Sequence, residues 1–184
     1  MKPFCFFSLF LFSFFTFHVI TTSSINPNIQ ETCNICAKDD PNPKAMLSFC
    51  TNVLQGAKKS EHASRRGLGK ISMTLLKANM NGTKFFIRET LNQTKLDPNL
   101  KLCLKSCRVE YKRMKLGVDL ALQDYKFEHY QDAHNEISGI MNAPTTCENL
   151  FKEKKISSPL TQRNEHALQL STMALCYIDK VVKK

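Results

Sequence analysis

The stretch Pro98–Glu153, PNLKLCLKSCRVEYKRMKLGVDLALQDYKFEHYQDAHNEISGIMNAPTTCENLFKE, decides the fold of this 184-residue chain. Its apolar residues recur at steps of three and four, which is typical of one face of a helix packed in a bundle. They are Leu100, Leu104, Cys107, Tyr111, Met114, Val118, Ala121 and Tyr125 in the first half, and Ala133, Ile137, Ile140, Pro144, Cys147 and Phe151 in the second. We therefore predict two long antiparallel helices with a chain reversal at residues 126–128.

Two cysteines lie on these apolar faces at equal distances from the predicted reversal. Residue 127 is the midpoint between Cys107 and Cys147, so the two side chains should lie opposite each other, close enough for a disulfide. Pro144 lies on the same face, although proline disrupts a helix interior by about 3 kcal/mol. We expect a kink or a local break of the second helix at residues 141–144.

The N-terminus reads as a secretory signal peptide, residues 1–24. A short basic start precedes an apolar run from Phe4 to Ile20, and small Thr and Ser residues follow. A transmembrane anchor is the alternative, which the shortness of the run disfavours. Removing Lys2 with the signal lowers the formal charge from +10 to +9. Such a charge suits an extracellular protein with weak affinity for acidic polysaccharide, or simply a solvated basic surface.

Seven cysteines remain after the signal: Cys33, Cys36, Cys50, Cys103, Cys107, Cys147 and Cys176. Disulfides are the default in a secreted chain, and an odd number leaves at least one thiol. Zinc is the alternative, suggested by Cys33-x-x-Cys36, but neither a second CxxC nor a matching His pair follows.

We predict the bridges Cys33–Cys50 and Cys107–Cys147 and leave the other three cysteines as thiols. Cys103 lies one long helix, roughly 43 Å, from the N-terminal hairpin that carries Cys36. Cys176 lies off both apolar rows of the last helix, beside Met173, and shows no obvious partner.

The rest of the chain predicts an all-α, up-down-up-down four-helix bundle, residues 61–184, preceded by a helical hairpin, residues 25–60. The first long helix should span residues 63–91, and the last residues 162–182. The expected core residues of the first are Leu68, Ile71, Leu75, Ala78, Gly82 and Phe85. Those of the last form two rows, namely Ala167, Leu170, Ala174, Tyr177 and Val181, and beside them Leu168, Ser171, Leu175, Ile178 and Val182.

No pattern in the mature chain predicts a catalytic, metal-binding or cofactor site. Its histidines, His62, His129, His134 and His166, fall in no hydrolase motif, and there is no GxSxG. We expect His129 and His134 to be exposed. Asn81-Gly-Thr83 and Asn92-Gln-Thr94 are acceptor sequences for N-glycosylation.

Residues 144–153, PTTCENLFKE, are similar to the TTC-E-x-x-F segment of the plant invertase/pectin methylesterase inhibitor family. Asp97-Pro98, Tyr130-Gln-Asp-Ala133 and Ser158-Pro159-Leu160 support the resemblance, which is strongest to the subgroup with plane-tree pollen allergen-like proteins. It implies a secreted, non-catalytic protein of the apoplast or cell wall, and the two acceptor sequences would make it a glycoprotein.

Such a protein covers the substrate cleft of one invertase or pectin methylesterase in a stoichiometric complex, and it binds no nucleic acid. Family invertase inhibitors can carry a Pro-Lys-Phe triplet that enters the invertase site. This chain has Tyr125-Lys126-Phe127 instead, at its expected helix turn rather than in the equivalent place, and we interpret that similarity as coincidental. An extracellular allergen-like or signalling protein without an enzyme target, and a polysaccharide-binding protein, are the alternatives.

Overall fold

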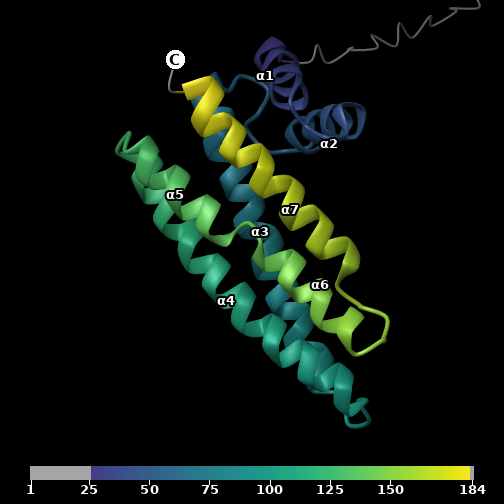
Figure 1. The fold of residues 1–184 in the computed structure, drawn as a ribbon. Helices are drawn as coiled ribbons and strands as arrows, with labels where there is room; N and C mark the ends of the chain where they lie inside the picture. Colours follow the sequence, from purple (N-terminus) through teal and green to yellow (C-terminus); the bar gives the residue numbers. More distant parts are fainter. Residues whose placement is uncertain (1–25, 183–184) are drawn as a thin grey trace, which may run out of the picture.

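The computed structural model describes residues 26–182, a helical hairpin followed by a four-helix bundle (Figure 1). The helices are α1 (Pro27–Ala37), α2 (Pro43–Gln55), α3 (Arg65–Leu91), α4 (Pro98–Lys126), α5 (Tyr130–Ile140), α6 (Ala143–Glu153) and α7 (Thr161–Cys176), and a π-helix, η1 (Tyr177–Val182), continues α7. The predicted signal peptide lies outside the described residues. None of the described helices is both long enough and apolar enough to cross a membrane.

The bundle has the predicted up-down-up-down order. Helix α3 packs against α4 and α7, while α4 packs against both α5 and α6 (Figure 1). The third position of the bundle therefore holds two helices, which are separated at Met141 and Asn142. Pro144 lies in the first turn of α6, where proline is tolerated, so the expected break is present and is placed just before the proline.

Polar caps followed by proline start three of the helices. Asn26, Asn42 and Asp97 precede Pro27, Pro43 and Pro98, and each cap side chain accepts a hydrogen bond from a backbone N–H of the first turn. The Asp97 carboxylate accepts from the Leu100 N–H at 2.9 Å. These caps satisfy otherwise unpaired N–H groups and fix where each helix begins.

The buried face of α3 differs from the predicted one. The buried residues are Leu68, Gly69, Ser72, Met73, Leu76, Met80, Thr83 and Ile87, whereas Phe85 is 58% exposed and Gly82 and Ala78 are exposed. Two polar residues lie on the true core face. The hydroxyl of Ser72 donates to the Gly69 carbonyl at 2.7 Å, and that of Thr83 to the Asn79 carbonyl at 2.9 Å. Their polar groups are satisfied within the helix, so a hydropathy pattern does not register them as core.

The last bundle helix is regular only as far as Cys176. Ala167, Leu170, Ala174 and Tyr177 are buried as predicted, and so are Ser171 and Ile178 of the second row. Leu168 and Leu175 are partly buried, while the side chains of Val181 and Val182 lie outside the described part of the chain.

The N-terminal hairpin lies at the end of the bundle where α3 begins and η1 ends (Figure 1). Cys33 and Cys50 join α1 to α2, the pairing expected from the sequence. The prediction that Cys36 and Cys176 are thiols is wrong, because they form a second disulfide with a Cα–Cα distance of 5.6 Å. In an up-down-up-down bundle the end of the last helix returns to the start of the first, which brings Cys176 to the hairpin.

A buried hydrogen bond lies beside this second disulfide. The hydroxyls of Thr32 in α1 and Tyr177 in η1 are 2.7 Å apart. Burial raises the pKa of Tyr177 to about 12, so its hydroxyl stays protonated over the physiological range. The hairpin is thus tied to the bundle by a covalent bond and a buried polar contact.

Candidate functional site

The segment that carries the family-like sequence, residues 144–153, lies against the bundle core. Cys147 forms a disulfide with Cys107, with a Cα–Cα distance of 5.1 Å, as the symmetry about residue 127 suggested. Phe151 is 1% exposed. Both side chains therefore point inward, where a binding partner cannot reach them.

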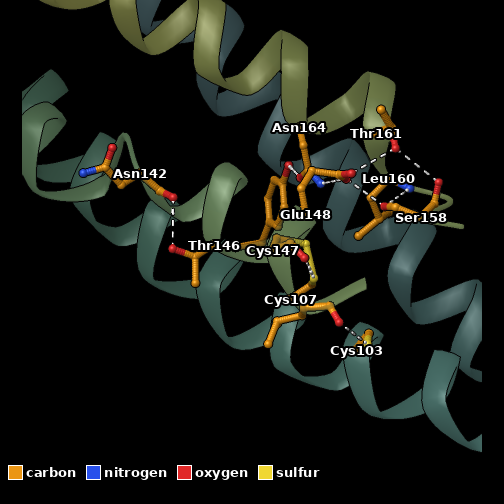
Figure 2. The surroundings of a disulfide bond; sticks show 12 residues. Cys103, Cys107, Asn142, Thr146, Cys147, Glu148, Ser158, Leu160, Thr161 and Asn164 are labelled. Atoms are coloured by element: carbon orange, nitrogen blue, oxygen red, sulfur yellow. Dashed lines mark hydrogen bonds between the residues drawn. A yellow bond between two sulfur atoms is a disulfide. The ribbon is translucent and has the colours of Figure 1, made fainter. Parts of the chain in front are cut away.

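Glu148 of the same segment organises the corner between α6 and α7. One carboxylate oxygen accepts from the Ser158 hydroxyl at 2.7 Å and from the Asn164 side-chain amide at 2.5 Å, and the other accepts from the Thr161 hydroxyl at 3.0 Å (Figure 2). Asn164 is 2% exposed, and its amide oxygen accepts from the Tyr111 hydroxyl at 2.6 Å. We call Glu148, Ser158, Thr161 and Asn164 the Glu148 corner.

These hydrogen bonds give each of the four residues of the Glu148 corner a structural role. A buried amide such as that of Asn164 must be hydrogen-bonded, and Glu148 and Tyr111 satisfy it from two sides. Burial raises the pKa of Tyr111, so that its hydroxyl remains a donor. The inward-facing residues of the family-like segment therefore fix the third and fourth bundle positions, whereas Thr145, Thr146, Asn149 and Lys152 of the same segment are exposed.

The remaining cysteine, Cys103, is buried one turn before Cys107. Its thiol lies 3.4 Å from the carbonyl of Leu150. Burial raises the pKa of this thiol, which keeps it protonated and poorly nucleophilic. Cys33 and Cys36 bond to different partners, so their CxxC spacing does not form half of a zinc site.

The turn between α4 and α5, residues 126–129, presents side chains to solvent. It lies at the α5 end of the third bundle position, whereas the Glu148 corner lies at the α6 end. Phe127 is 57% exposed, and the Lys126 ammonium lies 5.1 Å from the centre of its ring. His129 is exposed, and Glu128 has a φ of 66°, in the left-handed region that lets the chain reverse. Aromatic side chains such as that of Phe127 are enriched at protein interfaces.

The backbone of this α4–α5 turn is held firmly. The His129 N–H donates to the Asp124 carbonyl at 2.9 Å, and the Arg66 guanidinium donates to the Lys126 carbonyl at 3.1 Å. Arg66 also lies 3.2 Å from the Glu128 carboxylate. The turn is therefore braced from α3, which lowers the entropy cost of placing Phe127 in a partner.

Tyr125 anchors the turn from inside. Its hydroxyl donates to the Arg66 carbonyl at 3.0 Å, and its ring meets Tyr130 edge-on with centroids 5.4 Å apart. A Cβ at Gly69 would lie 2.2 Å from the Tyr125 oxygen, so only glycine fits there. Burial raises the pKa of Tyr125 as well. Of the triplet Tyr125-Lys126-Phe127, the first residue is structural and the other two face outward.

The second exposed surface lies between α3 and α4. Cations recur along α4 at steps of four and three: Lys101, Lys105, Arg108, Lys112 and Lys115. Lys84 and Arg88 face this row from α3 across two shallow hollows, of 380 and 540 Å³. Phe85, Leu102, Val109 and Leu116 are exposed on the same side, each by more than half. We call this surface the α3–α4 face.

The structure confirms only one of the two histidines that were predicted to be exposed. His129 is exposed, whereas His134 is partly buried and not exposed as predicted. Its Nδ1 lies 2.8 Å from an oxygen of Asp179, because η1 runs alongside α5. Within residues 26–182 there is no cluster of three or more His, Cys, Asp or Glu side chains that could hold a metal ion.

The two sequons differ in their surroundings. Asn81 is exposed in the middle of α3, where its sequon partner Thr83 is fully buried. Asn92 caps the end of α3, and Thr94 is exposed. Sequence reasoning found both asparagines but could not find this contrast, because the orientation of α3 was predicted incorrectly.

Known proteins resemble this chain over most of its length. The family model described as plant invertase/pectin methylesterase inhibitor matches residues 27–176. "Putative invertase inhibitor" from Platanus acerifolia is 36% identical over 171 residues, covering 92% of this chain and 93% of that protein. "Pectinesterase inhibitor 12" from Arabidopsis thaliana is 28% identical, covering 91% of this chain and 92% of that protein. A solved mutant form of a pectin methylesterase inhibitor from Arabidopsis, 21% identical, shares the fold with a TM-score of 0.69, covering 82% of this chain and 97% of that chain.

Proposed function

The chain belongs to the plant invertase/pectin methylesterase inhibitor family, and we propose that it is a secreted, non-catalytic inhibitor whose target is a cell-wall invertase. It binds that enzyme one-to-one and blocks its substrate cleft. The secretion part of the proposal rests on the signal-peptide pattern of residues 1–24. Family members are inhibitors and not enzymes.

The observation that carries the choice of mechanism is the α4–α5 turn. Substrate clefts are concave and accept a narrow, convex element. The turn offers such an element, with Lys126 and Phe127 outward on a backbone braced by Arg66. We propose that Lys126 and Phe127 enter the cleft because they are exposed on this braced turn; the similarity to the family's Pro-Lys-Phe triplet does not support this proposal, because the triplet here is not in the equivalent place.

The relatives support invertase over pectin methylesterase as the target. The Platanus protein named for invertase inhibition is 36% identical, whereas the Arabidopsis protein named for pectinesterase inhibition is 28% identical over a similar span. A pectin methylesterase is the alternative target and would be tested in parallel.

Titration of the two enzyme classes tests this proposal. The mature, oxidised protein is added in increasing amounts to a purified acid invertase and to a purified pectin methylesterase, and the residual activity is measured. We expect invertase activity to fall to zero near equimolar inhibitor. Inhibition of the methylesterase alone would refute the choice of target, and two fully active enzymes at excess inhibitor would refute the inhibitor function.

A second activity, weak binding to acidic polysaccharide, is favoured by the cation row of the α3–α4 face. Lys101, Lys105 and Arg108 follow one another at about 5 Å along α4, a spacing that lets them contact successive carboxylates of a polyuronate. Retention on immobilised polygalacturonate should therefore fall steeply with salt. Equal retention of a variant with all three residues changed to Gln would remove this candidate.

A further inference from the structure

We propose that Asn81 carries an N-linked glycan whose innermost sugar packs on the ring of Phe85 and covers the hollow between α3 and α4. This inference is independent of the enzyme target. It explains what covers the ring of Phe85, an apolar side chain that is 58% exposed on α3. The covering group is the glycan, which is part of the protein once the sequon is modified.

Helix geometry places the two residues together. Asn81 and Phe85 are four positions apart in α3, so their Cβ atoms lie roughly 5–6 Å apart on the same face. Aromatic side chains in helices lean toward the N-terminus, which directs the Phe85 ring toward Asn81.

The hollow fits a sugar in chemistry as well as in position. Its lining consists of Asn81, Lys84, Phe85, Arg88 and Arg108, and its volume is 380 Å³. The Arg88 guanidinium lies 4.9 Å from the centre of the Phe85 ring. Sugar C–H groups pack on an aromatic face, while the Lys and Arg side chains donate to the sugar hydroxyls.

The covalent step is ordinary transfer from a lipid-linked donor. Nδ2 of Asn81 forms a bond to the anomeric carbon of the oligosaccharide and loses one proton. The bond between that carbon and the pyrophosphate of the lipid donor breaks, and the pyrophosphate keeps the electron pair. No oxidation or reduction occurs.

Burial of Thr83 sets the time of this reaction. Its hydroxyl donates to the Asn79 carbonyl at 2.9 Å, and its side chain is 0% exposed in the folded chain. A transferase that must recognise the threonine can act only before α3 packs into the bundle. Asn92 is different, because Thr94 stays exposed after folding.

A double-mutant cycle in a eukaryotic secretory host tests the packing. Four full-length proteins are compared, all carrying Asn92→Gln so that one glycan is in question: the parent, Asn81→Gln, Phe85→Ala, and the double variant. Site occupancy is read by mass spectrometry, and the melting temperature is measured before and after trimming to the innermost sugar.

We expect Asn81 to be occupied and the parent to melt about 2–4 °C above Asn81→Gln. This difference should survive trimming and disappear in the Phe85→Ala background. Phe85→Leu, which keeps an apolar side chain but has no ring, should retain less than half of it. An unoccupied Asn81, or the same difference with and without the Phe85 ring, would overturn the proposal.

Discussion

The α4–α5 turn and the Glu148 corner both reverse the chain between antiparallel bundle helices, but they use their side chains in opposite directions. At the turn, backbone hydrogen bonds and Arg66 hold the chain, and Lys126 and Phe127 face solvent. At the corner, the Glu148 carboxylate faces inward and holds side chains of the following loop and helix. The inward-facing residues of the family-like segment thus stabilise the fold, and the outward-facing residues of the turn are the ones that we propose for binding.

The largest effect is expected at the Glu148 corner. Glu148→Ala removes the acceptor of three hydrogen bonds and leaves the buried amide of Asn164 partly unpaired, which should cost about 3 kcal/mol of unfolding free energy. The melting temperature should fall by about 6–12 °C, read by circular dichroism. Inhibition at 20 °C should be unchanged.

The matched control is Glu153→Ala, on the exposed side of the same helix. It should shift the unfolding free energy by no more than about 0.5 kcal/mol. If Glu148→Ala lost affinity for the enzyme while it remained fully folded, the division of roles between the corner and the turn would be wrong.

A smaller effect, on binding and not on stability, is expected at the α4–α5 turn. Phe127→Ala should weaken enzyme binding by about 30-fold, the size of a buried aromatic anchor, because its ring is the exposed apolar side chain of residues 126–129. The melting temperature should stay within about 1 °C of the parent. Inhibition assays at a series of inhibitor concentrations give the affinity.

Phe85→Ala, made in protein without glycans, is the control for an exposed phenylalanine of the same degree of exposure. It should leave inhibition unchanged. Equal losses for the two variants would mean that the enzyme contacts the α3–α4 face as well as the turn.

The smallest effect comes from the two ion pairs of Asp119, which belong to neither region. Burial alone would raise the pKa of Asp119, but hydrogen bonds from Lys115 and Lys77 outweigh it and lower the pKa below 3.8. A carboxyl group whose pKa is lower in the folded than in the unfolded state stabilises the protein at any pH above its unfolded-state pKa. This stabilisation is lost as the pH falls through the folded-state pKa. Asp119→Asn should therefore cost about 0.5–1 kcal/mol at pH 7, a modest figure because all three side chains are partly exposed.

The difference in unfolding free energy between the parent and Asp119→Asn should become smaller as the pH falls below about 4. Urea unfolding at pH 7, 5 and 3 measures this difference. A difference that increased at acidic pH would contradict the direction of the pKa shift.

The sequence predicted the elements that depend on spacing. Cys107 and Cys147 could be paired because their positions are symmetric about a turn that Phe127 marks. The four long segments and the break before Pro144 follow from periodicity and proline chemistry. Each of these features depends on only one or two neighbouring helices, so it can be predicted without knowing the rest of the fold.

What the sequence did not predict depends on the whole fold. Cys36 and Cys176 are 140 positions apart, and their pairing follows only from the return of the last helix to the hairpin. The core face of α3 was missed because Ser72 and Thr83 hide their hydroxyls against their own helix. The chain reversal at residues 126–128 was predicted, but the outward orientation of the Phe127 ring was not, because an apolar side chain at the end of a helix can equally pack inward.

The disulfides have a consequence for proteolysis at the α4–α5 turn, where exposed Lys126 offers a cleavage site. A cut after Lys126 would divide the chain into one piece with Cys36 and Cys107 and another with Cys147 and Cys176. Both long-range bridges, Cys36–Cys176 and Cys107–Cys147, cross that cut. The nicked protein would stay one molecule until a reductant separated it, so an inhibitor clipped by an extracellular protease would keep its two halves together.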